Sequence, residues 1–240
     1  MAYADGTISD PNAIKRWLHK QRFRDALRVL RAADSTKPIK VLDFGGGDGE
    51  LLRQCLQIHP LVSACLYEPT PWLRKEAQAK LSASKSIRIT SELSLIEKQS
   101  FDLVFCLEVF EHLPHEATRE AIASIYDLLN RNGLAVVGVP HEIFAPALLK
   151  GIFRMARRYG EYDALPRNVL MASVGRPPQN RPVAEISPGF AYHFHHLGFD
   201  YRDLEAGLAT RFNIIRKWFS PVRMFGPLLN SEVYYLLRKT

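Results

Sequence analysis

Hydrophobic residues follow two alternating patterns along most of the chain. Short continuous apolar runs predict buried strands at Ile39–Asp43, Leu61–Tyr67, Ile87–Ile89, Phe101–Leu107 and Leu134–Val139. Between them, apolar residues at helical spacing predict helices at Glu50–Ile58, Pro71–Ala83 and Pro114–Asn130. Strands that alternate with helices in this way form a parallel sheet with helices on both faces. The pattern therefore predicts an α/β fold with a doubly wound sheet.

Four further segments flank this core. Pro11–Ala33 reads as a helix, because Asp10 can cap it and proline suits a first helical turn. After the core, the pattern predicts a helix near Tyr201–Ala209 and strands near Phe212–Phe219 and Glu232–Leu237. We therefore divide the chain into an N-terminal basic helix, residues 1–36, and a single domain, residues 37–240.

A long irregular segment, His141–Gly198, separates the fifth strand from the later elements. It contains a helical piece at Ile143–Arg158 and an extended, proline-rich loop at Pro177–Pro182. Segments of this length without strong periodicity are uncommon in compact domains unless they cover or bind something. We therefore expect a lid inserted after the fifth strand, over about residues 141–198.

Composition places the chain among globular proteins. Of its 240 residues, 47% are hydrophobic and 24% are charged, which argues against disorder. No apolar run reaches the roughly 18 residues of a membrane-spanning helix, and the N-terminus lacks the apolar region of a secretory signal. Cys55, Cys65 and Cys106 each lie in an apolar stretch, which favours buried free thiols. These features predict a cytoplasmic domain.

The net charge of +7 is concentrated in two places. Seven basic residues and one acid between Lys15 and Arg31 give a local charge of +6. Between His141 and Arg181, seven basic residues and three acids give +4. The central part, Asp43–Val139, has nine basic residues and thirteen acids, a charge of −4. Basic segments on an acidic core indicate an anionic or membrane-borne partner, and nucleic acid is the less favoured alternative.

The sharpest motif follows the first strand and reads Asp43-Phe-Gly45-Gly-Gly47-Asp-Gly49. Alternate glycines after a buried strand let the backbone approach a ligand closely and adopt positive φ angles. The helix that follows presents unpaired N–H groups and a positive dipole to an anionic group. The spacing is neither that of a dinucleotide site nor that of a phosphate-binding P-loop. We interpret the motif as a cofactor site.

A second acid supports this interpretation. Glu68 ends the second strand, where acids in doubly wound folds accept hydrogen bonds from ribose hydroxyls. The two motifs together indicate an adenosine-type ligand across the strand tips.

At these residues the chain resembles the class I S-adenosylmethionine-dependent methyltransferases. The resemblance covers about Val41–Val139 and includes Tyr67-Glu68-Pro69 and the Glu-His-Leu-Pro sequence that ends at Pro114. It implies a Rossmann-like, seven-stranded, mostly parallel sheet whose last strand is antiparallel, and S-adenosylmethionine as cofactor.

The resemblance also assigns cofactor-binding residues by position. Asp43, Gly45 and Gly47, with Gly49 closing the motif, would surround the methionine part. Glu68 would bind the ribose hydroxyls, and the backbone near Leu107 would face the methionine amine. The family often has an aspartate after the third strand for the adenine amine; here Glu92 is the provisional substitute.

The sequence Glu108-x-x-Glu111-His112 after the fourth strand allows three interpretations. His112 could be a general base oriented by Glu111, because imidazole titrates near neutral pH. The trio also resembles a metal site of some ubiquinone-pathway and small-RNA methyltransferases. A later histidine would complete that site, for Mg²⁺ or Mn²⁺, or for zinc. His112 could instead only pack at the start of a helix.

Further histidines are candidates for the same site. Tyr192-His-Phe-His-His196 contains His193, His195 and His196, and resembles a segment that closes over the active site in such methyltransferases. His195 is the preferred catalytic member. His141 directly follows the fifth strand and could also line the crevice, although both positions are compatible with a surface or loop role.

The helical piece Ile143–Arg158 is a basic amphipathic helix. Its apolar residues fall on one face, and Lys150, Arg154, Arg157 and Arg158 fall on another. Such a helix can lie on an anionic membrane, cover a hydrophobic substrate or simply pack on its own domain. Its position after the fifth strand resembles the substrate-lid and membrane-docking element of quinone-pathway O-methyltransferases.

The sequence thus predicts an S-adenosylmethionine-dependent methyltransferase. Its acceptor is expected to be a small molecule or a lipid- or glycan-linked metabolite, methylated at oxygen. The expected location is cytoplasmic, with peripheral contact at the inner membrane face as an alternative. The rival functions are an RNA-modifying or nucleic-acid-binding protein and a cofactor-binding protein without catalysis, but no nucleic-acid recognition motif is found.

Overall fold

A seven-stranded sheet forms the centre of the computed structural model, which describes residues 13–187 and 189–239, without the side chains of residues 13–16, 18 and 19. The strand order is β3-β2-β1-β4-β5-β9-β8. The strands are β1 (Ile39–Phe44), β2 (Val62–Tyr67), β3 (Ile87–Thr90), β4 (Phe101–Leu107), β5 (Leu129–Pro140), β8 (Phe212–Ser220) and β9 (Glu232–Lys239). β1 to β5 pair in parallel, whereas β9 is antiparallel to both of its neighbours. The mostly parallel, Rossmann-like sheet and its antiparallel last strand are confirmed.

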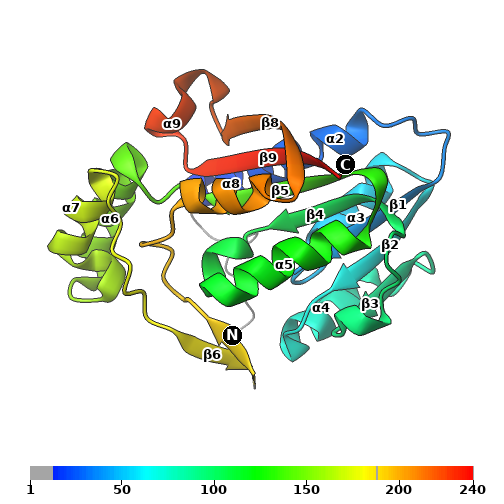
Figure 1. Ribbon diagram of the computed structural model, residues 1–240, viewed down its shortest axis with the longest axis horizontal. Coiled ribbons are helices and arrows are strands. Elements are labelled where there is room, and N and C mark those ends of the chain that lie inside the picture. The colour runs from blue at the N-terminus through cyan, green and yellow to red at the C-terminus, as the bar shows by residue number, and fades with distance from the viewer. Residues whose placement is uncertain (1–12, 188, 240) are drawn as a thin grey trace.

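Helices cover both faces of this sheet (Figure 1). One face packs against α5 (His115–Leu128) and α8 (Tyr201–Ala209), which contribute Ile125 and Leu204 to a buried cluster. The other face packs against α2 (Arg28–Arg31), α3 (Glu50–Ile58) and α4 (Pro71–Leu81). α1 (Ala13–Ala26) ends in the same second cluster. Each helix therefore buries the apolar side that its spacing predicts.

The strand order places a crevice above the first and fourth strands. From β1 the chain winds outward to β2 and β3 and then returns to the opposite side of β1 as β4. At this reversal the loops after β1 and β4 diverge, so a ligand can bind between them at the carboxyl ends of the strands.

Two boundaries differ from the sequence prediction by more than two residues or by a break in the element. The N-terminal helix is divided at Leu27 into α1 and α2, and its expected cap, Asp10 with Pro11, lies outside the described residues. β5 begins at Leu129, where we expected a helix to Asn130. Leu129 pairs with Phe101 in β4, so strand pairing takes this residue from the helix. Helical propensity is a local preference that tertiary pairing overrides.

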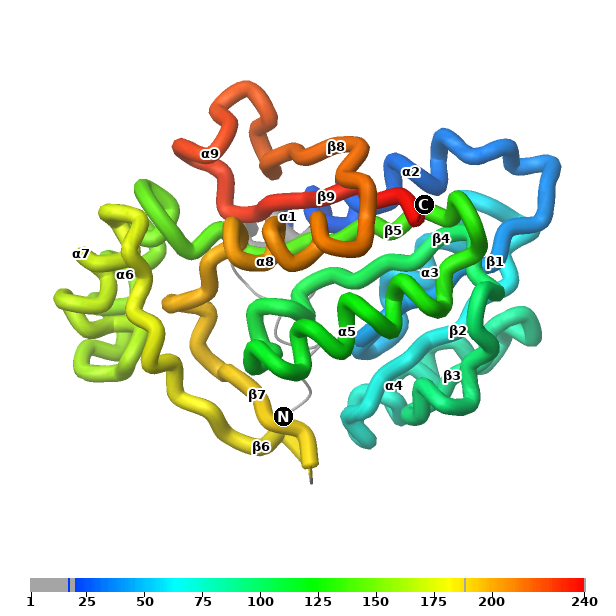
Figure 2. The backbone as a smooth tube through the Cα atoms, in the orientation of Figure 1, coloured from blue at the N-terminus to red at the C-terminus, as the bar shows by residue number. Residues whose placement is uncertain are grey.

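The segment after β5 has more regular structure than expected. It contains α6 (Phe144–Arg158), a 3₁₀ turn η3 (Tyr162–Ala164), α7 (Pro166–Ser173) and a hairpin of β6 (Ala184–Ser187) and β7 (Phe190–Tyr192). Figure 2 shows α6 and α7 side by side at one end of the molecule, with the hairpin running back beneath the sheet. We call residues 141–198 the insertion; its action as a lid stays a prediction.

Short elements complete the chain. η1 (Leu93–Leu95) follows β3, η2 (Phe110–His112) follows β4, and η4 (Arg223–Phe225) leads into α9 (Gly226–Leu229). All three cysteines are buried free thiols, as predicted. Among the described residues, no helix is both long and apolar enough to span a membrane.

Candidate functional site

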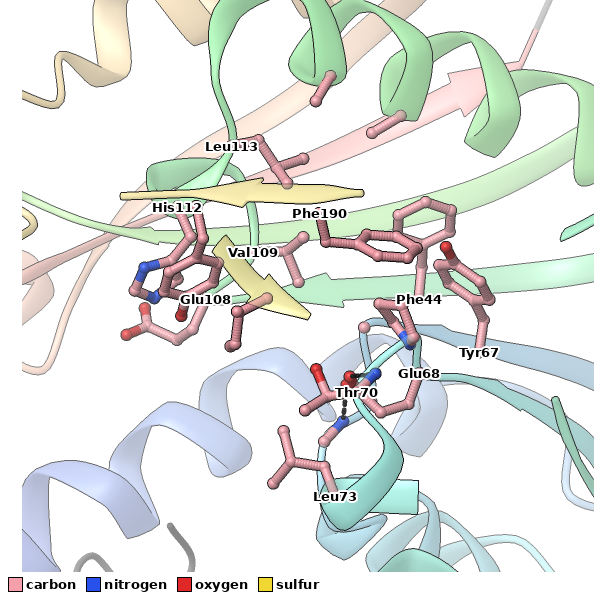
Figure 3. Close-up of a pocket in the computed structure, with 18 of the residues that line it drawn as sticks. Phe44, Tyr67, Glu68, Thr70, Leu73, Glu108, Val109, His112, Leu113 and Phe190 are labelled. Carbon is pink, nitrogen blue, oxygen red and sulfur yellow. Dashed lines mark hydrogen bonds between the residues drawn. The ribbon is translucent and has the colours of Figure 1, made fainter. Parts of the chain in front are cut away.

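A cavity of about 970 Å³ opens at the carboxyl ends of β1, β2 and β4. Its walls come from the glycine loop after β1, the turn after β2, η2, α5, the first helix and the hairpin of the insertion. Figure 3 shows Phe44, Tyr67 and Phe190 at one end of this cavity and Glu108 and His112 at the other. The cavity thus lies at the crevice that the strand order creates.

The glycine loop adopts backbone angles that other residues resist. Gly45, Gly47 and Gly49 have φ angles of 74°, 55° and 78°. A Cβ atom on Gly45 would lie 2.5 Å from a methyl group of Val109, so a larger residue there would collide with the loop after β4. A Cβ on Gly47 would meet nothing within 4 Å, because Gly47 faces the cavity. The loop therefore leaves room for a ligand against its backbone.

Glu68 is held in place by two backbone hydrogen bonds. The amide N–H of Gly47 donates to its Oε2 at 3.0 Å, and that of Thr70 donates to Oε1 at 2.8 Å (dashed in Figure 3). The side chain is 5% exposed and lines the cavity. Each carboxylate oxygen keeps a free lone pair, so Glu68 can accept two more hydrogen bonds from a diol.

Asp43 provides a second acid one strand away. It is 3% exposed, and its Oδ2 has no hydrogen-bond partner among the described residues. Burial, and the nearby carboxylates of Glu68 and Asp48, raise the pKa of Asp43 to about 8. A buried acceptor without a partner is costly, so this position favours a ligand that donates hydrogen bonds or carries positive charge.

These residues fit the cofactor that the resemblance implies. The ligand has a cationic amine and sulfonium near Asp43 in that assignment, and a ribose diol for Glu68. Gly45, Gly47 and Leu107 also line the cavity. Gly49 lies just behind it as the N-cap of α3. Glu92 is exposed and does not line the cavity, whereas its neighbour Leu93 does.

Charged residues form a buried group at the opposite end. Arg22 of α1 places Nη2 3.1 Å from Glu108 Oε2 and 2.8 Å from Glu232 Oε1. Glu108 has a φ of 55°, and burial raises its pKa although Arg22 opposes this. The ion pairs connect the first helix, the loop after β4 and the start of β9.

Glu111 lies next to this group and is fully buried. Neither of its carboxylate oxygens has a hydrogen-bond partner among the described residues. Burial and the charge of Glu232 raise its pKa to about 8. At neutral pH a proton is therefore favoured on Glu111, because burial of the ionised form outweighs the stabilising charges of Arg22 and Arg181.

His112 has a defined tautomer and a low proton affinity. The carbonyl oxygen of His193 lies 2.8 Å from its Nδ1, so Nδ1–H donates and Nε2 carries the lone pair. Burial lowers the pKa of His112 to about 4, and its ring stacks on Tyr192 with centroids 4.3 Å apart. His112 lines the cavity as a neutral imidazole near pH 7. Such a group can accept a proton from a bound hydroxyl.

The predicted metal residues are only partly brought together. Glu111, His112 and His196 each offer one potential ligand atom, and these three atoms lie within 4.8 Å of one another. His112 Nε2 is 3.8 Å from Glu111 Oε1. Glu108 is not part of this group, because Arg22 holds it. The sequence offered three later histidines that could complete a metal site. Of these, His196 is the one that lies beside Glu111.

The other candidate histidines lie outside the cavity. His195 Nδ1 is 3.3 Å from Asp163 Oδ1, within the insertion. His193 presents its Nδ1 to the carbonyl of Pro182 at 2.9 Å. His141 is fully buried, donates from Nδ1 to the carbonyl of Asn230 at 3.1 Å and contacts the ring of Tyr201.

Sequence reasoning missed several residues at this site. Arg22 carried no local signal, because its partners are far away in the sequence. Glu232 starts a strand that we interpreted only as sheet. Phe190 and Tyr192 belong to a hairpin that was not predicted, although the aromatic residues around the histidine cluster did indicate an active-site segment.

Comparison with known proteins connects this geometry to a family. Residues 16–169 match the methyltransferase domain family. An uncharacterised methyltransferase of Bacillus licheniformis is 30% identical over 137 residues, which cover 55% of this chain and 63% of that relative.

Solved structures share the fold at low sequence identity. The N-methyltransferase NodS of Bradyrhizobium japonicum, in complex with S-adenosylhomocysteine, has a TM-score of 0.57 and 14% identity, covering 99% of this chain and 93% of that one. The 1,6-didemethyltoxoflavin-N1-methyltransferase of Burkholderia thailandensis has a TM-score of 0.56 and 16% identity, covering 99% and 85%.

Proposed function

Because the chain belongs to the class I S-adenosylmethionine-dependent methyltransferases, we propose that it methylates a hydroxyl oxygen, with His112 as the proton acceptor. The observation that carries this proposal is a neutral, oriented imidazole in the wall of the cavity. The acceptor would be a small molecule, free or as the reactive end of a lipid- or glycan-linked metabolite.

The cofactor end of the cavity is assigned to Asp43, Gly45, Gly47 and Glu68. When bound, S-adenosylmethionine supplies a methyl group on a positively charged sulfur. Glu68 would fix the ribose, since backbone donors already hold its carboxylate in position. Asp43 would face the positive end, where its partnerless oxygen is compensated. Fixed partners reduce the entropy lost on reaching a reactive geometry.

The acceptor end combines one neutral base with the ion pair of Arg22 and Glu108, which also line the cavity. Leu113 and Tyr192 contribute apolar surface near His112, and the ring of Tyr192 stacks on its imidazole. His112 would take the hydroxyl proton on Nε2 while Nδ1–H stays bonded to the carbonyl of His193. That hydrogen bond favours the imidazolium that forms, so the carbonyl compensates part of the cost of a buried charge.

A metal at Glu111, His112 and His196 is the alternative role for the same residues. The two roles are exclusive, because a lone pair of His112 Nε2 that binds a cation cannot accept a proton. Treatment with a chelator separates them. As a proton acceptor, His112 retains full activity after dialysis against EDTA; loss of activity that Mg²⁺, Mn²⁺ or Zn²⁺ restores would assign the metal role instead.

One observation favours an RNA acceptor as a second candidate. Arg28, Arg216 and Arg223 line one groove, in which Asp25 pairs with Arg28 and Arg223. Burial, and then the charges of Arg28, Arg216 and Arg24, lower the pKa of Arg223. Clustered guanidinium groups bind phosphates. Binding of RNA through such a patch would weaken steeply as salt rises.

The deciding experiment is transfer of a labelled methyl group into fractionated lipid, glycan, small-molecule and RNA extracts. We expect label in a methyl ether of a non-RNA fraction, with a loss of roughly 100-fold or more in His112→Gln. His195→Gln is the matched control, because His195 lies outside the cavity. Label in RNA alone, or equal rates in both variants, would contradict the proposal.

A further inference from the structure

The solvent side of α6 and α7 exposes an unusual amount of apolar surface. We call this surface the insertion tip; its large side chains are between 42% and 71% exposed and comprise Leu148, Leu149, Ile152, Phe153, Leu170 and Val174. Leu148, Leu149, Ile152 and Phe153 belong to α6. Pairs of them lie four residues apart, so the four side chains share one side of that helix. Contiguous exposed apolar patches on a globular protein mark interaction sites.

The packing inside the helix pair explains why these side chains point outward. α6 and α7 meet through small residues, and a Cβ on Gly151 would lie 2.3 Å from a methyl group of Val169. The buried cluster beneath contains Ala147, Val169, Ala172 and Leu197. Because small residues fill this internal contact, the larger apolar residues of the insertion tip lie on its solvent side.

Charges around the insertion tip differ from those that the sequence suggested. Lys150 and Arg154 are neutralised by the buried carboxylate of Glu142, with Nζ and Nη1 each 2.8 Å from it. Arg157, Arg167 and Arg176 are exposed, and none pairs with an acid in the described part of the chain. Glu161 is the exposed acid of α6, η3 and α7, and it lies beside Arg158. The rim of the insertion tip is therefore cationic.

The exposed apolar side chains and the cationic rim together indicate which kind of partner could cover the insertion tip. The helix pair lies at one end of the molecule (Figure 1), where an extended surface can reach both helices. A second copy would bring two cationic rims together, which costs free energy through like-charge repulsion. An anionic bilayer accepts apolar side chains below its headgroups and attracts arginines at them.

We propose that the insertion tip docks on the surface of an anionic lipid bilayer. Phe153 and Leu170 would enter the boundary between headgroups and acyl chains, and Arg157 and Arg167 would lie against anionic headgroups. The proposal concerns location and does not depend on which atom of the acceptor is methylated. Docking on a bilayer is consistent with a lipid-linked acceptor but does not require one.

Sedimentation of the full-length protein with vesicles tests this. The protein should pellet with vesicles of phosphatidylcholine and phosphatidylglycerol and remain in solution with phosphatidylcholine alone. Phe153→Ser with Leu170→Ser should weaken binding at least tenfold through lost apolar burial. Arg157→Glu with Arg167→Glu should weaken it roughly fivefold or more per arginine.

Matched controls separate docking by the insertion tip from nonspecific effects of net charge and of exposed apolar side chains. Lys85→Glu with Arg131→Glu makes the same change of net charge at exposed positions elsewhere, and Leu95→Ser removes an exposed leucine outside the insertion. These variants should bind like the parent chain, and all variants should unfold cooperatively with urea. Equal binding by parent and insertion-tip variants, or no binding to anionic vesicles, overturns the proposal. A dimer that Phe153→Ser dissociates would assign the insertion tip to a second copy.

Discussion

Asp43 and Glu68 stand at the ends of neighbouring strands but differ in how they are satisfied. Glu68 receives two backbone hydrogen bonds, whereas Asp43 has an oxygen with no partner among the described residues. The first carboxylate is therefore positioned before any ligand binds, and the second depends on a ligand for compensation. Both roles follow from the strand tips on which the residues lie.

The role of Glu68 predicts a loss of cofactor affinity in Glu68→Gln. The amide nitrogen of glutamine cannot accept from Gly47 or Thr70, so the side chain loses one of its fixed bonds and an acceptor for the ribose. Binding of S-adenosylhomocysteine, measured by calorimetry, should weaken by roughly tenfold to a hundredfold. Glu92→Gln is the control: it is exposed outside the cavity, and an equal loss there would make Glu92 the more important acid.

The low pKa of His112 predicts an unusual acid limb of the pH profile. Burial lowers this pKa to about 4, so the imidazole is neutral and active above that pH and is lost as a base only when pH falls towards it. The value of kcat/KM should therefore decline near pH 4 to 5 and not near 6.5. A profile that declines at 6.5, or an unchanged limb in the residual activity of His112→Gln, would remove His112 from this role.

At the scale of elements, the insertion is held by a buried ionic network. Glu142, at the start of the insertion, contacts Lys150 and Arg154 of α6, and Asp163 of η3 contacts Arg158. Lys150 and Arg154 were expected on a free basic face. The structure corrects this, because the acids that pair with them are brought in by the turns on either side of the helix.

This network predicts a large stability difference between two similar substitutions. Glu142→Gln leaves two partly buried cations without their carboxylate and should lower the free energy of unfolding by about 3 kcal/mol. Glu161→Gln removes an exposed partner of Arg158 and should change it by less than about 1 kcal/mol. Urea unfolding gives both values. Similar values for the two would mean that the network does not hold the insertion.

At the scale of the whole molecule, the first helix is tied into the domain and its site. Leu27 and Leu30 are buried in the cluster beneath the sheet, Phe23 lines the cavity, and Arg22 bridges Glu108 and Glu232. The division into residues 1–36 and 37–240 was based on the helical spacing and basic charge of the first segment, which precedes the alternating strands and helices. Burial and ion pairing favour one cooperative unit instead.

Removal of residues 1–36 provides the corresponding prediction. A chain of residues 37–240 should lose both cooperative unfolding and binding of S-adenosylhomocysteine, because it exposes the apolar surface under Leu27 and leaves Glu108 without Arg22. In the full chain, Leu27→Ala should cost about 3 kcal/mol, and Trp17→Ala, which changes a side chain that is 46% exposed, much less. A shortened chain that binds the ligand as the full chain does would restore the original division.

The sequence by itself determined the sheet, the glycine loop and the acid at the second strand tip. Each of these depends on local order: apolar runs give strands, and glycines and acids directly after a strand are carried to its carboxyl end. The buried cysteines followed from the same local information, whereas family membership and the antiparallel last strand followed from the resemblance of the motifs to a known family; all are confirmed.

Tertiary structure alone decided which distant residues share the site and which charges remain exposed. His196, and not His195, lies beside Glu111, and Arg22 reaches Glu108 and Glu232 across the fold. Neighbouring histidines in a loop look alike in sequence, because the direction of each side chain is set by the segment packed against it. The same holds for the net charge of +7. Only the fold shows that the buried carboxylate of Glu142 neutralises Lys150 and Arg154 of α6, whereas the arginines at the rim of the insertion tip stay exposed.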